Sequence, residues 1–289
     1  MTGNRYMDAH SGPLPAEQHV IDRLTAALPP GPAEFAILIF KQLSACLFGA
    51  SILALLIFTS AIWQSDWAIA RYDFLVVAAV AIQVLFIATR LETLGEAKVI
   101  LFFHITGMVM EIFKVSAGSW SYPEPGLLKV GDVPLFTGFM YASVGSYFSR
   151  SLRLFHARLD GYPTEWMTWL LAAAIYVNFY SHHFIWDVRY VLMAATLILF
   201  ARTVIAGRIA EQTFRVPLIG LVLFATFLLF VAENVGTHTG TWTYGQGTRV
   251  ALAKAGSWYL LLYVAFVQVA LVHRTRLVKH KNPNTGETR

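Results

Sequence analysis

The chain has 289 residues, of which 56% are hydrophobic and 13% are charged, and its formal net charge is +5. Soluble globular domains carry about 25% charged residues, so this composition argues against a soluble protein and indicates an integral membrane protein. The cations lie in short segments between long apolar runs, which is typical of membrane topology and gives no reason to expect a nucleic-acid partner. The single cysteine, Cys46, lies within an apolar run, so no intramolecular disulfide can form.

The first 34 residues form a polar, proline-containing segment that we expect to be cytoplasmic. It lacks a cationic start followed by an apolar run, so we predict no cleavable signal peptide. Within it, the stretch "AEQHVIDRLTAAL" predicts a short amphipathic helix lying on the inner membrane surface.

Residues 35–275 predict a single transmembrane domain, because they contain eight apolar runs of the length that crosses a bilayer as a helix, about 20 residues. We place these runs at about 36–63, 72–89, 98–116, 133–149, 165–181, 187–206, 215–235 and 251–272. The predicted fold class is therefore all-α, an integral membrane bundle of about eight helices. Gly138, Ala142 and Ser146 recur every four residues, a spacing that allows close helix approach in membranes. The tail at 276–289 is polar, and we expect it to be disordered.

The distribution of Lys and Arg predicts the orientation of the chain. Fifteen of the 22 cations flank one set of loops and termini, six flank the opposite set, and Lys41 lies in the first apolar run. Because cations are enriched on the cytoplasmic side, we expect both termini to be cytoplasmic. The third, fifth and seventh runs then point outward, which places Glu111, His182, His183 and Glu233 near the external face.

One twelve-residue pattern occurs twice in the chain. Residues 111–122 are "EIFKVSAGSWSY" and residues 233–244 are "ENVGTHTGTWTY", so E-x6-G-x-W-x-Y recurs at an offset of 122 residues. That offset corresponds to four apolar runs, an even number, so both copies have the same orientation. A parallel four-plus-four repeat follows, with halves at about 35–150 and 151–275 related by an axis along the membrane normal.

The duplicated pattern predicts two equivalent corners of one site. Glycine permits a sharp turn, so we expect each copy to be a helix end followed by a loop that folds the Trp and Tyr back over the Glu. The alternative is that each Glu pins a helix end and the aromatic residues belong to the interfacial belt. Asn234 either joins the site or bridges helices. The candidate substrate-binding residues are Trp120, Tyr122, Trp242, Tyr244, Asn234, Gly118 and Gly240.

The candidate catalytic residues are Glu111, Glu233, His104 and His183. His104 lies two helical turns before Glu111 on the same helix face, and ionisable groups inside a membrane span are site candidates by default. A transition metal such as zinc or iron is a further hypothesis. Its candidate ligands are His104, His182, His183, His238 and Asp187, with packing histidines as the alternative, since no HExxH or HxxxH spacing is present. Motifs for nucleotide binding and thiol redox chemistry are absent.

The stretches "EIFKVSAGSWSYPEPG", "VPLFTGFMYASVGSY", "YVNFYSHHF" and "ENVGTHTGTWTY" resemble the bacterial domain-of-unknown-function family 817 over about residues 35 to 275. This resemblance implies a multi-pass inner-membrane protein and brings no settled reaction. A fainter likeness links Glu111, Gly118, Tyr122 and Val133-Pro134-Leu135 to carotenoid hydratases of the bisanhydrobacterioruberin type. The second complete motif and the histidine pair depart from that pattern.

Three functional hypotheses follow. The first is a membrane enzyme that modifies a lipid or isoprenoid, such as a lyase or hydratase, with one glutamate as acid and the other as base, or with a metal. The second is a transporter or channel for a small polar solute. The third is a scaffold or sensor in which both motifs lock loops over the bundle. The sequence leaves the substrate and the oligomeric state open.

Overall fold

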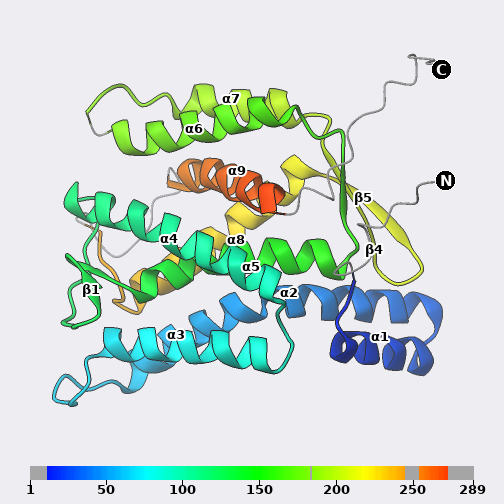
Figure 1. Cartoon of the computed structure of the whole chain (residues 1–289), viewed down its shortest axis with the longest axis horizontal. Coiled ribbons are helices and arrows are strands. Elements are labelled where there is room, and N and C mark those ends of the chain that lie inside the picture. The colour runs from blue at the N-terminus through cyan, green and yellow to red at the C-terminus, as the bar shows by residue number, and fades with distance from the viewer. Residues whose placement is uncertain (1–11, 183, 245–253, 273–289) are drawn as a thin grey trace.

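The computed structural model describes residues 12–182, 184–244 and 254–272, so the predicted disordered tail at 276–289 lies outside the described residues. The chain is mostly helical (Figure 1). Its helices are α1 (Pro15–Ala27), α2 (Pro30–Ile62), α3 (Arg71–Ala88), α4 (Leu94–Ser116), α5 (Phe136–Leu154), α6 (Glu165–Ser181), α7 (Arg189–Phe200), α8 (Leu218–His238) and α9 (Ala255–Val272). Its strands are β1 (Lys129–Val130), β2 (Val133–Pro134), β3 (Arg158–Asp160), β4 (Val204–Arg208) and β5 (Thr213–Pro217).

A helix lies in each of the eight ranges that the sequence predicts as spans. Among the described residues, four helices are long and apolar enough to cross a membrane, namely α2, α3, α4 and α8. By contrast, α7 has 12 residues and is therefore about 18 Å long, shorter than the hydrocarbon core of a bilayer, about 30 Å. The structure thus supports a helical membrane protein.

Two small antiparallel sheets modify the expectation of a purely helical chain. β1 pairs with β2, and β3, β4 and β5 form a three-stranded sheet with β4 in the centre. The sequence predicts residues 204–206 as the end of the span at 187–206, because they are apolar. They form a strand instead, because Val204 and Ile205 favour extended backbone and find partners on both sides.

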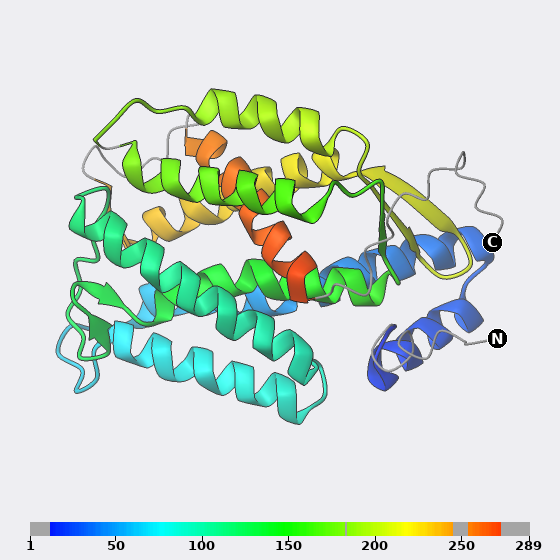
Figure 2. The same ribbon diagram turned by 45° about the horizontal axis from the view of Figure 1, so that its top comes forward.

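The bundle consists of two groups of helices that meet along α5, α8 and α9. In one group α5 packs against α4 and α2, and in the other α9 packs against α6, α7 and α8. Contacts of α5 with α9 and of α2 with α8 join the groups. Figures 1 and 2 show α6 and α7 along one edge of the molecule, with α9 between them and α5.

Glycines let α4 and α5 approach closely. A Cβ on Gly138 would lie 2.5 Å from the His104 ring, and one on Gly107 would lie 2.6 Å from the Tyr141 ring. Close approach through small residues is the usual mode of helix packing in membranes. Gly138, the first residue of the small-residue spacing in α5, therefore allows the close helix approach that the sequence predicts.

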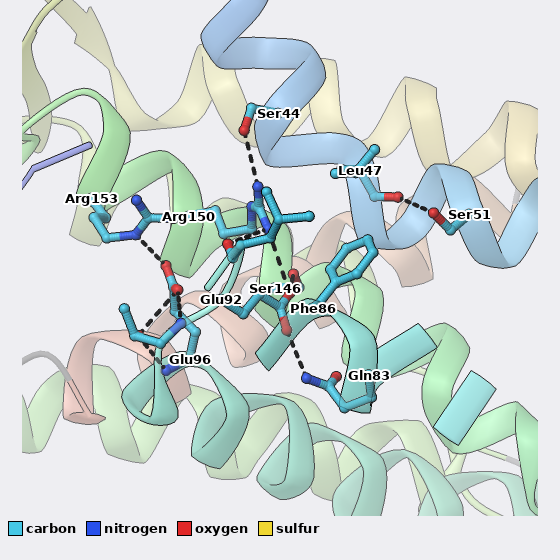
Figure 3. A network of polar contacts seen from close by, with 12 residues as sticks. Ser44, Leu47, Ser51, Gln83, Phe86, Glu92, Glu96, Ser146, Arg150 and Arg153 are labelled. Carbon is cyan, nitrogen blue, oxygen red and sulfur yellow. Dashed lines mark hydrogen bonds and ion pairs between the residues drawn. The ribbon is translucent and has the colours of Figure 1, made fainter. Parts of the chain in front are cut away.

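A buried ionic network lies at the end of the bundle that carries α1 (Figure 3). The Arg150 Nη1 atom lies 3.9 Å from Glu92 Oε1, and the Arg153 Nε atom donates to Glu96 Oε1 at 2.7 Å. Glu17 of α1 accepts from Arg153 Nη1 at 2.5 Å and from Arg150 Nη2 at 3.4 Å. This short helix, which the sequence predicts as amphipathic, is therefore joined to the bundle through ion pairs.

Candidate functional site

The two copies of the E-x6-G-x-W-x-Y pattern adopt the same local structure. Each Glu lies in the last turns of a long helix, and the helix ends in a turn at a glycine with positive φ, +70° at Gly118 and +67° at Gly240. The same three backbone hydrogen bonds close both turns: Ala117 N to Phe113 O, Gly118 N to Val115 O and Ser119 N to Lys114 O in the first copy, and Thr239 N to Val235 O, Gly240 N to Thr237 O and Thr241 N to Gly236 O in the second.

The two motif loops pair with each other at equivalent positions. Ser121 and Thr243 exchange both backbone hydrogen bonds at 3.0 Å, and their hydroxyl oxygens lie 3.1 Å apart. An antiparallel bridge between equivalent residues has a local two-fold axis at its centre. The two copies therefore form one assembly with approximate two-fold symmetry.

The Glu111 carboxyl group accepts three hydrogen bonds. Trp120 Nε1 and the Tyr122 hydroxyl both donate to Oε2 at 2.7 Å, and the Tyr141 hydroxyl of α5 donates to Oε1 at 2.8 Å. The Glu111 side chain is 3% exposed. The predicted placement of Trp and Tyr over the Glu is thus observed, with Tyr141 as an additional donor.

The second copy holds Glu233 in a related way. The Tyr244 hydroxyl donates to Glu233 Oε2 at 2.8 Å, and the Trp242 ring packs against Gly236 in the space that a side chain there would fill. The Trp120 ring centroid lies 5.8 Å from that of Tyr244. Trp120 and Tyr244 therefore connect the two carboxyl groups through one aromatic contact.

Both glutamates line the same cavity, which has a volume of about 700 Å³. Its walls come mainly from α2, α5, α8 and α9 and are largely apolar, whereas its charged lining gathers around the two motifs. Such a combination of apolar walls and a few convergent polar groups is characteristic of ligand sites.

Three cations reach the polar end of the cavity from different elements. The Lys114 Nζ atom of α4 lies 4.0 Å from the Phe179 ring centroid, and Lys254 Nζ, next to α9, lies 3.0 Å from that of Tyr244. Arg189, at the start of α7, donates from Nε to Asp187 Oδ2 at 2.5 Å. The end of the cavity near the glutamates therefore carries both acidic and basic groups.

The first residues of α3 form hydrogen bonds with the second motif loop. The Tyr72 hydroxyl donates to the Thr241 carbonyl at 2.7 Å, and Arg71 Nη2 donates to the Thr241 hydroxyl at 3.0 Å. Arg71 also forms an ion pair with Glu124, which follows the first motif. One arginine thus ties both motif loops to the same helix.

The tyrosines of the motifs remain hydrogen-bond donors. Burial raises the pKa of the Tyr122 hydroxyl well above its usual value, and the Glu111 carboxyl raises it further. Burial likewise raises the pKa of the Tyr244 hydroxyl, with the Glu233 carboxyl as the next contribution. Both phenols therefore keep their protons at neutral pH and orient the two glutamates.

The structure places the other predicted site residues away from the glutamates or at the edge of the cavity. His104 packs edge-on against Phe139 and is not among the cavity-lining residues, while His182 lines the cavity with Nδ1 3.0 Å from the Asn178 carbonyl. Asn234 donates to the Phe230 carbonyl of its own helix, so this hydrogen bond neither reaches the glutamates nor bridges two helices. His238 is exposed at the end of α8.

The described residues contain no cluster of side chains that supports the hypothesis of a metal site. Among them, no group of three or more His, Cys, Asp and Glu side chains is arranged to hold a metal ion. Asp187 accepts from Arg189 and from Asn178 Nδ2 at 3.2 Å. Helix α6 ends at Ser181, and His183 lies outside the described residues.

Sequence reasoning missed Tyr141, Lys114, Arg189 and Lys254 as site residues. Tyr141 follows Glu111 by 30 residues and belongs to another helix, so no local pattern connects them. Gly107 could have indicated a residue such as Tyr141, since a glycine one turn before a buried Glu leaves room for a large side chain from a neighbouring helix. Lys114 could have been noticed because it lies three residues after Glu111 and hence on the same helix face.

Comparisons with known proteins agree with the resemblance noted in the sequence. Residues 34–266 match the family described as "Protein of unknown function (DUF817)". A relative from Bacillus subtilis (strain 168), "Uncharacterized protein YoaT", is 38% identical over 252 residues, which are 86% of this chain and 94% of the relative. No solved structure matches the chain. Because the family match extends over both glutamate motifs and most of the bundle, the chain belongs to the DUF817 family.

Proposed function

We propose that this protein is a multi-pass protein of the bacterial inner membrane with eight spans, a parallel four-plus-four repeat and both termini in the cytoplasm. The four long apolar helices support membrane insertion. The identical turns after α4 and α8 and their pairing at Ser121 and Thr243 support the repeat. The bias of Lys and Arg supports the orientation.

Within this architecture, we propose that the protein is an enzyme that modifies a lipid or isoprenoid by acid–base chemistry. The observation that carries the proposal is that Glu111 and Glu233 line one cavity of about 700 Å³ with apolar walls. A hydrocarbon chain fits such walls, and two carboxyl groups in one cavity can act as a proton donor and a proton acceptor.

Hydration of a carbon–carbon double bond illustrates what the arrangement can do. One glutamate gives its proton to one alkene carbon, and the positive charge that forms on the other carbon is stabilised by aromatic faces. Water then bonds to that carbon and loses a proton to the second glutamate. Trp120, Tyr122, Trp242 and Tyr244 provide the aromatic faces beside the two carboxyl groups. The reverse sequence of steps eliminates water, as a lyase does.

The test compares extracted lipids and pigments of a deletion strain with those of strains complemented by wild-type protein, Glu111→Gln or Glu233→Gln. We expect the deletion and both variants to accumulate the same unmodified compound. Glu165→Gln, at the exposed start of α6, is the matched control and restores the wild-type profile. Identical profiles in all strains, with each protein present and folded, would reject an enzyme of this kind.

Transport of a small polar solute is the second candidate, because the two glutamates lie on equivalent motifs at the junction of the two helix groups, where transporters with parallel repeats bind substrate. Solute uptake into proteoliposomes that depends on both Glu111 and Glu233 would favour this function. A scaffold or sensor would differ from an enzyme and from a transporter. In that case Glu111→Gln and Glu233→Gln would lower the amount of folded protein and would change neither the lipid profile nor solute uptake.

A further inference from the structure

The charged side chains that line the cavity lie at one end of it. Its apolar wall on α2 runs from Cys46 to Leu56, which corresponds to about 15 Å along a helix axis. Along this length the facing wall is formed by apolar side chains of α8 and α9 such as Leu228 and Leu262. An elongated apolar ligand is therefore accommodated better than a compact polar one.

The polar end collects three cations as well as the two glutamates. Lys114 is 3% exposed, and it reaches this end together with Arg189 and Lys254 from three separate segments of the chain. Lys and Arg side chains donate charge-assisted hydrogen bonds to phosphate and carboxylate groups. The three cations therefore provide several donors for an anionic group at this end of the cavity.

The acidic groups at this end already accept from the protein's own donors. Glu111 accepts from Trp120, Tyr122 and Tyr141, Glu233 accepts from Tyr244, and Asp187 accepts from Arg189. A cationic ligand would have to compete with these contacts, whereas an anionic ligand adds an acceptor beside Lys114 and Lys254, whose ammonium groups lie over aromatic rings.

We propose that the cavity binds an anionic amphiphile with one phosphate or carboxylate head and a single hydrocarbon chain. The head lies between Lys114, Arg189 and Lys254, and the chain extends between α2, α5, α8 and α9. This inference rests on the proposed function, because it names the substrate class of the same cavity. It also places the carbons next to the head beside Glu111 and Glu233, where proton transfer would occur.

The test uses the full-length protein in nanodiscs of uncharged phosphatidylcholine and follows the fluorescence of the tryptophans, three of which line the cavity, namely Trp120, Trp242 and Trp258. The probes are dodecyl phosphate, dodecyltrimethylammonium and inorganic phosphate. We expect dodecyl phosphate to bind at least tenfold more tightly than either of the others. Equal binding of dodecyltrimethylammonium would overturn the charge preference, and equal binding of inorganic phosphate would overturn the amphiphile.

The variants connect binding to particular cations. Lys254→Gln and Lys114→Gln should each weaken dodecyl phosphate binding by about tenfold, the effect of losing one charge-assisted contact. Lys98→Gln, an exposed position on the same helix as Lys114, should bind as the wild type does. Lys254 precedes α9 and is half-buried, so its variant remains informative if Lys114→Gln does not fold. Unchanged binding in Lys254→Gln would contradict the proposal.

The two proposals fail in different ways. If lipid profiles depend on Glu111 and Glu233 but dodecyl phosphate does not bind, the substrate is not an anionic amphiphile and the enzyme proposal stands. If dodecyl phosphate binds through Lys254 and the profiles do not change, the ligand site stands and the enzyme proposal is rejected.

Discussion

At the scale of single residues, the two glutamates differ in how the protein holds them. Glu111 accepts from donors on its own motif and on α5, whereas Glu233 accepts from Tyr244 of its own motif. The approximate two-fold symmetry of the motifs therefore does not extend to the hydrogen-bond donors of the two carboxyl groups. A pair of like groups in different surroundings can divide the roles of acid and base.

The hydrogen bond from Tyr141 should contribute measurably to stability. Tyr141→Phe removes a donor from the buried Glu111 carboxyl, so we expect a loss of about 1–3 kcal/mol in the free energy of unfolding, as for other buried polar groups left without a partner. Tyr190→Phe is the control, because Tyr190 is 76% exposed, and its effect should stay within about 0.5 kcal/mol. Denaturant unfolding in micelles measures both, and equal effects of the two substitutions would contradict the assigned role of Tyr141.

Adding even one methyl group at Gly107 should destabilise the protein. In Gly107→Ala the new methyl group would overlap the Tyr141 ring, so we expect a loss of about 1–3 kcal/mol from overpacking. Gly220→Ala in α8 is the matched control, since nothing lies within 4 Å of its added Cβ, and it should be neutral or stabilising by up to about 1 kcal/mol. Thermal unfolding of both variants measures this difference. Equal stability of the two variants would show that the packing of α4 on α5 tolerates a larger residue at position 107.

At the scale of elements, the sequence predicts what depends on neighbours along the chain. The turns at Gly118 and Gly240 follow from the need for positive φ, and the return of each Trp and Tyr over its Glu follows from the length of the loop. The position of Tyr141 depends on how α5 packs on α4, which no local pattern records. Strand β4 was missed because an apolar, β-branched stretch resembles the end of a span until its partner strands are known.

We predict that ion pairs hold the short polar helix α1 on the membrane bundle. Glu17→Gln leaves Arg150 and Arg153 with fewer counter-charges in a buried site, and we expect a loss of about 3–5 kcal/mol. Asp22→Asn, at an exposed position of the same helix, should have little effect. Limited proteolysis should cleave Glu17→Gln between α1 and α2 faster than the control, and equal rates would show that apolar contacts alone hold α1.

At the scale of the whole molecule, the two ends of the bundle differ in chemistry. One end carries helix α1 and the ionic network around Arg150, and the other carries the glutamate motifs and the charged part of the cavity (Figure 1). A ligand that enters from the membrane between helices would meet the apolar walls first. The proposed orientation makes the motif end external, and this can be tested without knowing the substrate.

Single cysteines report which end faces outward. In a Cys46→Ser background, we introduce Trp186→Cys in the loop between α6 and α7, where Trp186 is 91% exposed, and Glu211→Cys in the exposed β4–β5 turn at the opposite end. The bias of Lys and Arg places the first loop outside and the second inside. A membrane-impermeant maleimide applied to intact spheroplasts should label only the cysteine at position 186, and both cysteines after lysis. Labelling of only the cysteine at position 211 would invert the topology and put the glutamates at the cytoplasmic face, whereas equal labelling of both before lysis would contradict a bundle that crosses the membrane from one end to the other.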